Sequence, residues 1–228
     1  MSKLLTRSLD KLKRDLLELG AMVERETEKA ILALVDRRTD LADEVKRGGG
    51  DIDRREVDIE RECLTTLALH QPVATDLRFI IVALKVNNDL ERMGDLAINI
   101  AARAADLAKH APIATPLHFP EMAACVRSMV RKSLDALVNL DTAMAREVLA
   151  MDDQVDASNR RMYTLLQELM QQDPQTIERA VHLLSASRHL ERMADLATNI
   201  AEEVVFMVEG HVIRHRVGGH PDDSGGAA

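Results

Sequence analysis

The sequence predicts an all-α protein, and its composition, internal repetition and helical periodicity support this fold class. Aromatic residues make up only 2% of the 228 residues, and Trp is absent, whereas Ala, Leu, Met, Glu and Arg abound. The abundant residues are strong helix formers, and a β-sandwich or barrel needs many more β-branched and aromatic side chains. Hydrophobic residues at 46% and charged residues at 30% are typical of a globular chain with a substantial core.

The first half of the chain has the pattern of three helices. Apolar residues three or four positions apart predict a first helix from about Leu4, which we expect to end at the breaker Gly48-Gly49-Gly50. A second helix is expected from Asp51 to Leu69, since the residue before Pro72 disfavours the α region. The third helix is expected from Pro72 to Lys109, because proline suits a first helical turn.

The second half repeats this plan. The segment from His110 to Pro116 contains two prolines, which no helix interior tolerates, and it is expected to link the halves. Further helices are expected from Phe119 to Met151 and from Asp152 to Gln172. After a break at Asp173-Pro174, a sixth helix is expected to end near Glu209.

The two halves are copies of one unit. The run Leu90-Glu91-Arg92-Met93-Gly94-Asp95-Leu96-Ala97-Ile98-Asn99-Ile100-Ala101 matches residues 190–201 at ten of twelve positions, an offset of 100 residues. Upstream, Ala33-Leu34-Val35 matches Ala136-Leu137-Val138 at an offset of 103. Such repetition implies two tandem three-helix bundles related by a pseudo-two-fold axis. We expect one repeat at residues 1–110, a second at 118–209 and a disordered tail at 210–228, whose histidines His211, His215 and His220 are possible metal ligands.

Core packing explains most residues that the two copies share, but it does not explain a set of oxygen-bearing side chains. Glu91, Asp95 and Asn99 lie four residues apart, so they share one helix face away from the apolar seam, as do residues 191, 195 and 199. Adjacent carboxylates at this spacing repel by about 0.2–0.5 kcal/mol on an isolated helix. Asp53 and Asp156 hold equivalent places in the second helix of each half, with Asp152 one turn before Asp156. The pattern favours a bound hard divalent cation or iron, which oxygen ligands suit.

Two other interpretations of these acids remain open. Arg92 and Arg192 are placed to neutralise them in ordinary surface ion pairs. Alternatively, the acidic faces of a metal-independent helical adaptor dock basic partner surfaces.

The motifs resemble those of PhoU proteins over about residues 5 to 210. The resemblance rests on Gln71-Pro72-Val73-Ala74-Thr75-Asp76-Leu77-Arg78, on the 90–101 run and on its second copy, Glu191-Arg192-Met193-Ala194-Asp195. It implies a cytoplasmic homodimer of three-helix bundles that carry metal ions (iron, manganese, magnesium or zinc) on carboxylate motifs. It also implies negative regulation of the phosphate regulon and phosphate uptake, through the transporter ATPase subunit PstB and the sensor histidine kinase PhoR.

Carried onto this chain, the resemblance implies a set of carboxylate metal ligands, with two asparagines beside them. These are Glu91, Asp95, Glu191, Asp195, Asp152, Asp156 and Asp53, flanked by Asn99 and Asn199. One position departs from the pattern, because Gly49 stands where the second half has Asp152. We therefore expect a weaker or differently composed site in the first half.

Several other classes of protein are disfavoured. A net charge of −8 argues against nucleic-acid binding, and no apolar run approaches the roughly 18 residues of a membrane span. Cys63 and Cys125 have no CxxC spacing and are expected to be buried thiols of a reducing, cytoplasmic compartment. The chain contains neither Glu-x-x-His nor a phosphate-binding loop, so we expect a regulatory adaptor without catalytic residues.

Overall fold

A computed structural model describes residues 3–113 and 117–209, which form six α-helices and one short 3-10 helix and contain no strand. The helices are α1 (Lys3–Val35), α2 (Thr39–His70), α3 (Ala74–Leu107), α4 (Phe119–Asn139), α5 (Thr142–Gln172) and α6 (Ile177–Glu209), with η1 (Pro174–Thr176) before α6. The predicted all-α fold with six helices is therefore confirmed. No helix of the described residues is both long and apolar enough to cross a membrane. The tail expected to be disordered, residues 210–228, lies outside the described residues.

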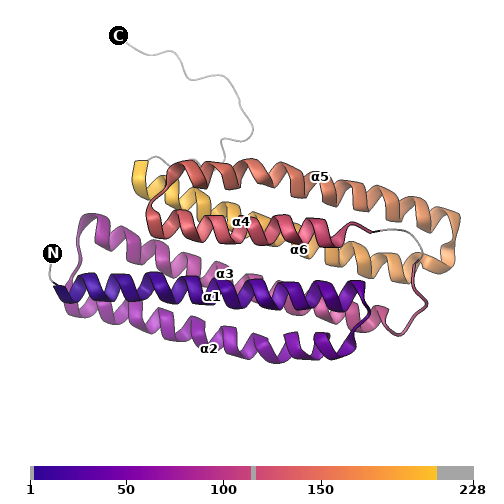
Figure 1. Ribbon diagram of the computed structural model, residues 1–228, viewed down its shortest axis with the longest axis horizontal. Coiled ribbons are helices and arrows are strands. Elements are labelled where there is room, and N and C mark those ends of the chain that lie inside the picture. Colours follow the sequence, from indigo (N-terminus) through magenta and orange to yellow (C-terminus); the bar gives the residue numbers. More distant parts are fainter. Residues whose placement is uncertain (1–2, 114–116, 210–228) are drawn as a thin grey trace, which may run out of the picture.

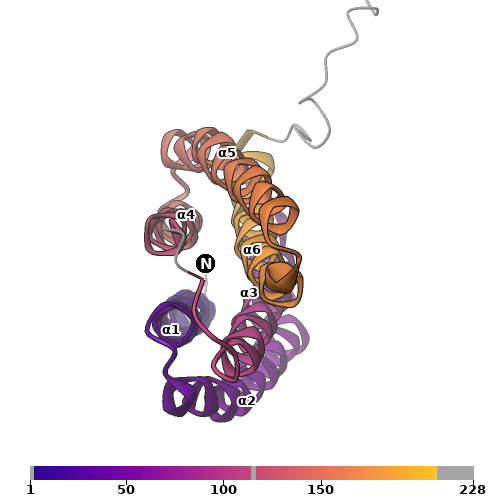
Figure 2. The same cartoon turned by 90° about the vertical axis from the view of Figure 1, so that its right-hand side faces the viewer.

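The six helices form two antiparallel three-helix units that lie against each other (Figure 1). Seen end on, α1, α3, α4 and α6 surround the centre, while α2 and α5 lie at the two outer ends (Figure 2). The units join through two helix pairs, α3 with α6 and α1 with α4. The predicted pair of duplicated three-helix bundles is confirmed, and the repeated 90–101 segment lies in the α3–α6 contact.

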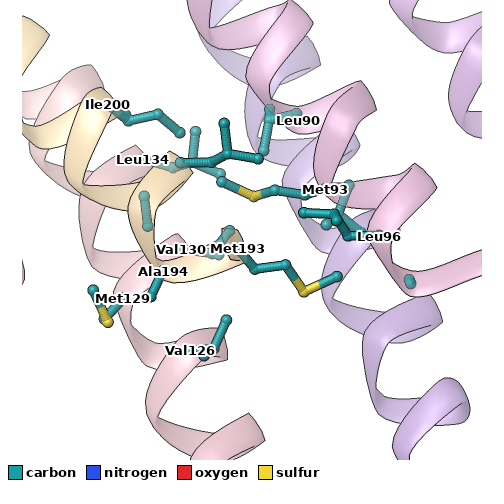
Figure 3. Packing of buried hydrophobic residues seen from close by; sticks show 14 of the residues in the cluster. Leu90, Met93, Leu96, Val126, Met129, Val130, Leu134, Met193, Ala194 and Ile200 are labelled. Carbon is teal, nitrogen blue, oxygen red and sulfur yellow. The ribbon is translucent and has the colours of Figure 1, made fainter. Parts of the chain in front are cut away.

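The hydrophobic core is continuous across both units. Figure 3 shows Leu90 and Met93 of α3, Met129 of α4, and Met193 and Ile200 of α6 gathered in one cluster. All five side chains are buried, and the first unit also reaches the cluster through Thr27, whose Oγ1 lies 3.9 Å from the sulfur of Met193. The apolar positions of the repeated segment therefore hold the two units together.

The triple glycine does not end the first helix. Helix α1 ends at Val35, near Arg37 with a φ of 58°, and Gly48-Gly49-Gly50 lies inside α2. The prediction was wrong because tertiary packing along a 32-residue helix outweighs a helix-propensity cost of about 1 kcal/mol for each glycine. At the real corner, the backbone N–H of Arg38 donates to the carbonyl of Ala33 at 3.1 Å. Neither proline nor glycine marks this turn.

The corner between α4 and α5 was also misplaced. Helix α4 ends at Asn139 and not at Met151, so Asp152 lies in the interior of α5. Leu140 has a φ of 56° and is the equivalent of Arg37 at the 103-residue offset. The side chain of Asp141 accepts a hydrogen bond from the backbone N–H of Met144 at 3.0 Å. This N-cap was a usable sequence signal, since aspartate is among the preferred residues there.

The other predicted corners agree with the structure to within a few residues. Helix α2 ends just before Pro72, and α6 ends at Glu209 as expected. The predicted break at Asp173-Pro174 is the short helix η1, where the Asp173 side chain accepts from the backbone N–H of Gln175 at 3.0 Å.

The two cysteines differ in burial. Cys63 is buried as expected, and burial raises the pKa of its thiol to about 12. Cys125 is only partly buried, which corrects the expectation of a second core thiol. Burial and then the negative charge of Asp152 raise the pKa of the Cys125 thiol. Cys125 therefore lies near the acids of the second unit.

Candidate functional site

The second unit brings four carboxylates together between α5 and α6. Asp152 and Asp156 lie one turn apart on α5, and Glu191 and Asp195 lie one turn apart on α6. Burial, followed by the charges of Asp195 and Asp156, raises the pKa of Asp152 to about 6. Burial and the same two charges also raise the pKa of Glu191, and burial with Asp156 raises that of Asp195. Mutual repulsion within the set shows that the four acids share one electrostatic site, here called the second acidic site.

The donor atoms of the second acidic site suit a hard cation. Oδ1 of Asp152 is buried and has no hydrogen-bond partner in the described residues, and a buried carboxylate oxygen left unpaired is costly. A divalent cation or iron would satisfy this oxygen and offset the repulsion. Among the described residues, however, no three His, Cys, Asp or Glu side chains converge closely enough to hold a metal ion. Binding of a metal ion would therefore require these side chains to turn toward one another.

The first unit holds a smaller group of predicted acids, here called the first acidic site. Burial, followed by the charges of Asp95 and Asp53, raises the pKa of Glu91, so these three acids interact. Sequence reasoning missed a fourth member, Glu56. Burial, Glu60 and Asp53 raise the pKa of Glu56, whose Oε1 accepts a hydrogen bond from Asn87 Nδ2 at 2.9 Å. The available signal was its position three residues after Asp53, on the same side of α2.

The two acidic sites differ most at Gly49. A Cβ built on Gly49 would lie 2.4 Å from Cδ1 of Ile98, so the isoleucine fills the space beside this glycine. The equivalent positions in the second unit carry Asp152 and Thr198. An acid in one unit is therefore replaced by a glycine in the other, and a hydroxyl-bearing side chain is replaced by an aliphatic one.

The two copies of the repeated segment also meet in one groove between α3 and α6. This groove has a volume of about 490 Å³ and is lined by Arg92, Asp95, Leu96 and Asn99 together with their equivalents Arg192, Asp195, Leu196 and Asn199. The asparagines predicted to lie beside the acids thus share the groove with Asp95 and Asp195. The four-residue spacing in the sequence puts the acid and the asparagine of each copy on one helix face, but it does not reveal that the faces of both units border the same space.

Comparison with known proteins assigns the chain to a family. The model of the PhoU domain matches residues 16–104 and 119–204, which are the cores of the two repeats. The chain belongs to the PhoU family. The resemblance inferred from the sequence motifs is therefore confirmed, and each three-helix unit contains one PhoU domain.

Members of the PhoU family resemble the chain over nearly its whole length. The phosphate-specific transport system accessory protein PhoU homolog of Aquifex aeolicus is 39% identical over 212 residues, which cover 93% of this chain and 96% of the relative. The homolog of the same name from Pseudomonas aeruginosa is 37% identical and covers 91% and 86%.

Two solved PhoU structures share the fold. The crystal structure of PhoU from Pseudomonas aeruginosa has a TM-score of 0.84 at 35% identity and covers 90% of this chain and 99% of that chain. The phosphate transport system regulatory protein PhoU from Streptococcus pneumoniae has a TM-score of 0.80 at 28% identity and covers 92% and 99%.

Proposed function

We propose that this protein is a negative regulator of phosphate uptake and of the phosphate regulon. In this role it is a cytoplasmic, homodimeric adaptor that links the ATPase subunit PstB of a phosphate ABC transporter to the sensor histidine kinase PhoR. The observation that carries the proposal is the end-to-end similarity, in both repeats, to accessory proteins of phosphate-specific transport systems.

Exposed aliphatic side chains support an adaptor role. Leu77 and Ile81 of α3 are exposed by 38% and 42%, and their equivalents Ile177 and Val181 of α6 by 47% and 53%. Exposed apolar positions that recur at the same place in both repeats do not serve the core of either unit. Exposed apolar surface of this kind marks sites of protein–protein contact when it is clustered.

The proposed adaptor also binds a metal ion. Asp152, Asp156, Glu191 and Asp195 would hold an iron-type or divalent ion (iron, manganese, magnesium or zinc), with Asp53, Glu91 and Asp95 as the weaker set. The unpaired Oδ1 of Asp152 and the raised pKa values of the second acidic site support this assignment. When bound, the metal supplies positive charge that offsets carboxylate repulsion, and the residues of α5 and α6 would be tied together through it.

A deletion strain tests the regulatory role. Without the protein, we expect phosphate-starvation genes to stay switched on in high-phosphate medium, as measured by a reporter for one such promoter. Complementation with the intact chain restores repression. Normal repression in the deletion strain would contradict the regulatory assignment.

Elemental analysis tests the metal proposal separately. The full-length chain with His211, His215 and His220 replaced by Ala is purified without added metal, beside the same chain carrying Glu191→Ala and Asp195→Ala. We expect bound metal in the first and little in the second, with nearly equal helicity by circular dichroism because the acids lie outside the core. Equal, negligible metal in both proteins would favour the alternative, a metal-independent adaptor whose acidic faces dock basic partner surfaces.

A further inference from the structure

A group of basic side chains lies at one end of the α3–α6 contact. Arg103 of α3 reaches α6, where its Nη1 is 3.3 Å from Nδ1 of His182. Arg188, His189 and Arg192 lie nearby on α6. Arg188 and Arg192 lie one turn apart on α6 and are exposed, and His189 directly follows Arg188. We call Arg103, Arg188, His189 and Arg192 the basic cluster.

The basic cluster has unused hydrogen-bonding capacity. Arg188 and Arg192 form no hydrogen bond or ion pair of their own within the part of the chain that the structure describes. Arg103 has a carboxylate at 4.0 Å, Oδ2 of Asp106, at the outer limit of an ion pair. Nδ1 of His189 is buried and has no partner among the described residues, while its Nε2 lies 3.3 Å from Ser185 Oγ. Arg188 and Arg192 therefore keep their hydrogen-bond donors available, although both act electrostatically on Glu191, and Arg192 also acts on Asp195.

The pseudo-two-fold axis provides an internal comparison. At the other end of the α3–α6 contact, the positions equivalent to those of the basic cluster carry Glu203, Asn88, Asp89 and Arg92. There Lys85 Nζ donates to Glu203 at 2.9 Å, and Arg92 Nη1 lies 3.7 Å from Asp89 Oδ1. That end is balanced in charge, whereas the basic cluster gathers three guanidinium groups in a chain of net charge −8. The helical framework that the two repeats share therefore does not explain the excess of positive charge at the end that carries the basic cluster.

The groove between α3 and α6 leads to the basic cluster. Arg192 lines this groove together with Asn99, and Arg103 lies one helical turn beyond Asn99 on α3. The amide of Asn99 and the guanidinium groups of Arg192 and Arg103 therefore lie at neighbouring positions along the α3–α6 contact. Guanidinium groups bind planar or tetrahedral oxyanions through paired N–H···O bonds, which a lysine cannot reproduce.

We propose that the basic cluster, with Asn99, binds a phosphate-type oxyanion at this end of the groove. The ligand is inorganic phosphate or the phosphate group of a nucleotide, which present the same oxygens. The choice of phosphate among oxyanions rests on the proposed function, and binding here would make the protein itself responsive to phosphate. The carboxylates of Asp95 and Asp195, which also line the groove, and that of Glu191 near Arg188 and Arg192 oppose the anion and weaken its binding.

Calorimetric titration of the full-length chain tests the proposal. Inorganic phosphate is titrated in one arm and AMP in the other, both in the presence of a chelator so that metal at the acidic sites plays no part. We expect saturable binding of one of these ligands, and the arm that binds identifies the source of the phosphate group. Arg192→Gln should weaken binding about tenfold or more, because a charge-assisted hydrogen bond is lost.

The matched control is Arg92→Gln, which removes the same charge at the equivalent position of the balanced end. We expect this variant to change the affinity less than about twofold, since Arg92 lies outside the basic cluster. Arg188→Gln, at an exposed position, repeats the test without risk to the fold and should also weaken binding. Absence of saturable binding of either ligand, or equal weakening by Arg92→Gln and Arg192→Gln, would overturn the proposal.

The test of phosphate binding and the test of the regulatory role can fail independently of each other. Phosphate binding with normal repression in the deletion strain would retain the site and remove the regulatory role. Failure to bind phosphate, together with loss of repression in that strain, would retain the regulator and remove the site.

Discussion

Arg131 of α4 forms an ion pair with Glu24 of α1, across the second contact between the two units. The reciprocal pair, Arg127 with Glu28, lies one turn away at 2.9 Å. At the 103-residue offset, Glu24 is the equivalent of Arg127 and Glu28 is the equivalent of Arg131. The first unit therefore carries both acids of this seam and the second carries both bases. This division of charge favours contact between a first and a second repeat over contact between two copies of the same repeat.

Charge reversal tests the contribution of the α1–α4 seam to stability. Arg131→Glu should lower the free energy of unfolding by about 0.5–1 kcal/mol, since both pairs are partly exposed and the new carboxylate faces Glu24. Adding Glu24→Arg should restore most of this loss. A double-mutant cycle by urea unfolding at low and at high salt measures the coupling, and a coupling that salt does not weaken would contradict an electrostatic origin.

Two glycines in helix interiors should respond to alanine in opposite ways. A Cβ on Gly20 of α1 would lie 2.1 Å from Cδ1 of Leu134, so Gly20→Ala should destabilise the protein by about 1–3 kcal/mol through overpacking. A Cβ on Gly50 of α2 would meet only Nη1 of Arg54, at 3.7 Å. Gly50→Ala should therefore stabilise by up to about 1 kcal/mol through helix propensity. Urea unfolding of the two variants gives the comparison, and stabilisation by both would show that Leu134 moves aside freely.

The difference between the two acidic sites should be reversible by exchange of two residues. Gly49→Asp alone is expected to cost about 1–3 kcal/mol, because the new side chain collides with Ile98. Combining it with Ile98→Thr copies the second unit into the first and should recover part of that stability. We also expect the double variant to bind more metal than the parent chain, by elemental analysis. Equal losses for the single and double variants would show that Ile98 does not exclude the carboxylate.

The raised pKa of Asp152 predicts a pH dependence of stability in metal-free protein. Because this pKa is about 6 in the folded state and 3.8 ordinarily, the folded state binds the proton of Asp152 more tightly than the unfolded state does. The stability that this proton contributes is fully present below pH 4 and is lost as the pH rises through 6. Asp152→Asn should therefore stabilise the chain at pH 7.5 by about 1 kcal/mol, after allowance for solvent screening, and change little at pH 4.

Thermal unfolding in a chelating buffer at the two pH values measures this effect. Glu168→Gln, at an exposed position of the same helix and away from the second acidic site, is the control and should be nearly neutral at both. If Asp152→Asn were no more stable than the parent chain at pH 7.5, repulsion within the second acidic site would be too weak to favour a cation.

The all-helical class and the composition of the acidic faces could be predicted because they depend on residues close together in the sequence. The duplication could be predicted because its two copies can be compared directly. The four-residue spacing of Glu91, Asp95 and Asn99 places them on one face in any α-helix. The repeated segment at 190–201 then implies the same face in the second unit. The Asp173-Pro174 break was also predictable, since proline restricts the backbone wherever it occurs.

Contacts between helices decided what these local rules could not. Gly94 of α3 packs against Ile52 of α2, with Cδ1 of Ile52 3.0 Å from the place of a Cβ. The second unit has Ala194 and Val155 at these positions. Relative to the first unit, the residue on α6 is therefore one carbon larger and the residue on α5 is one carbon smaller. Neither residue by itself reveals this exchange of volume, because the filled space belongs to the pair.

The sequence by itself determined which faces each helix presents, since periodicity and capping act within a few residues. Only the tertiary structure decided that Gly48-Gly49-Gly50 stays helical and that Arg37 turns the chain, because packing energy collected along a whole helix exceeds local propensity. It also decided that Arg103 lies beside His182 and that both repeats line one groove. These neighbours come from segments far apart in the chain, and the close packing of α3 against α6 brings them together.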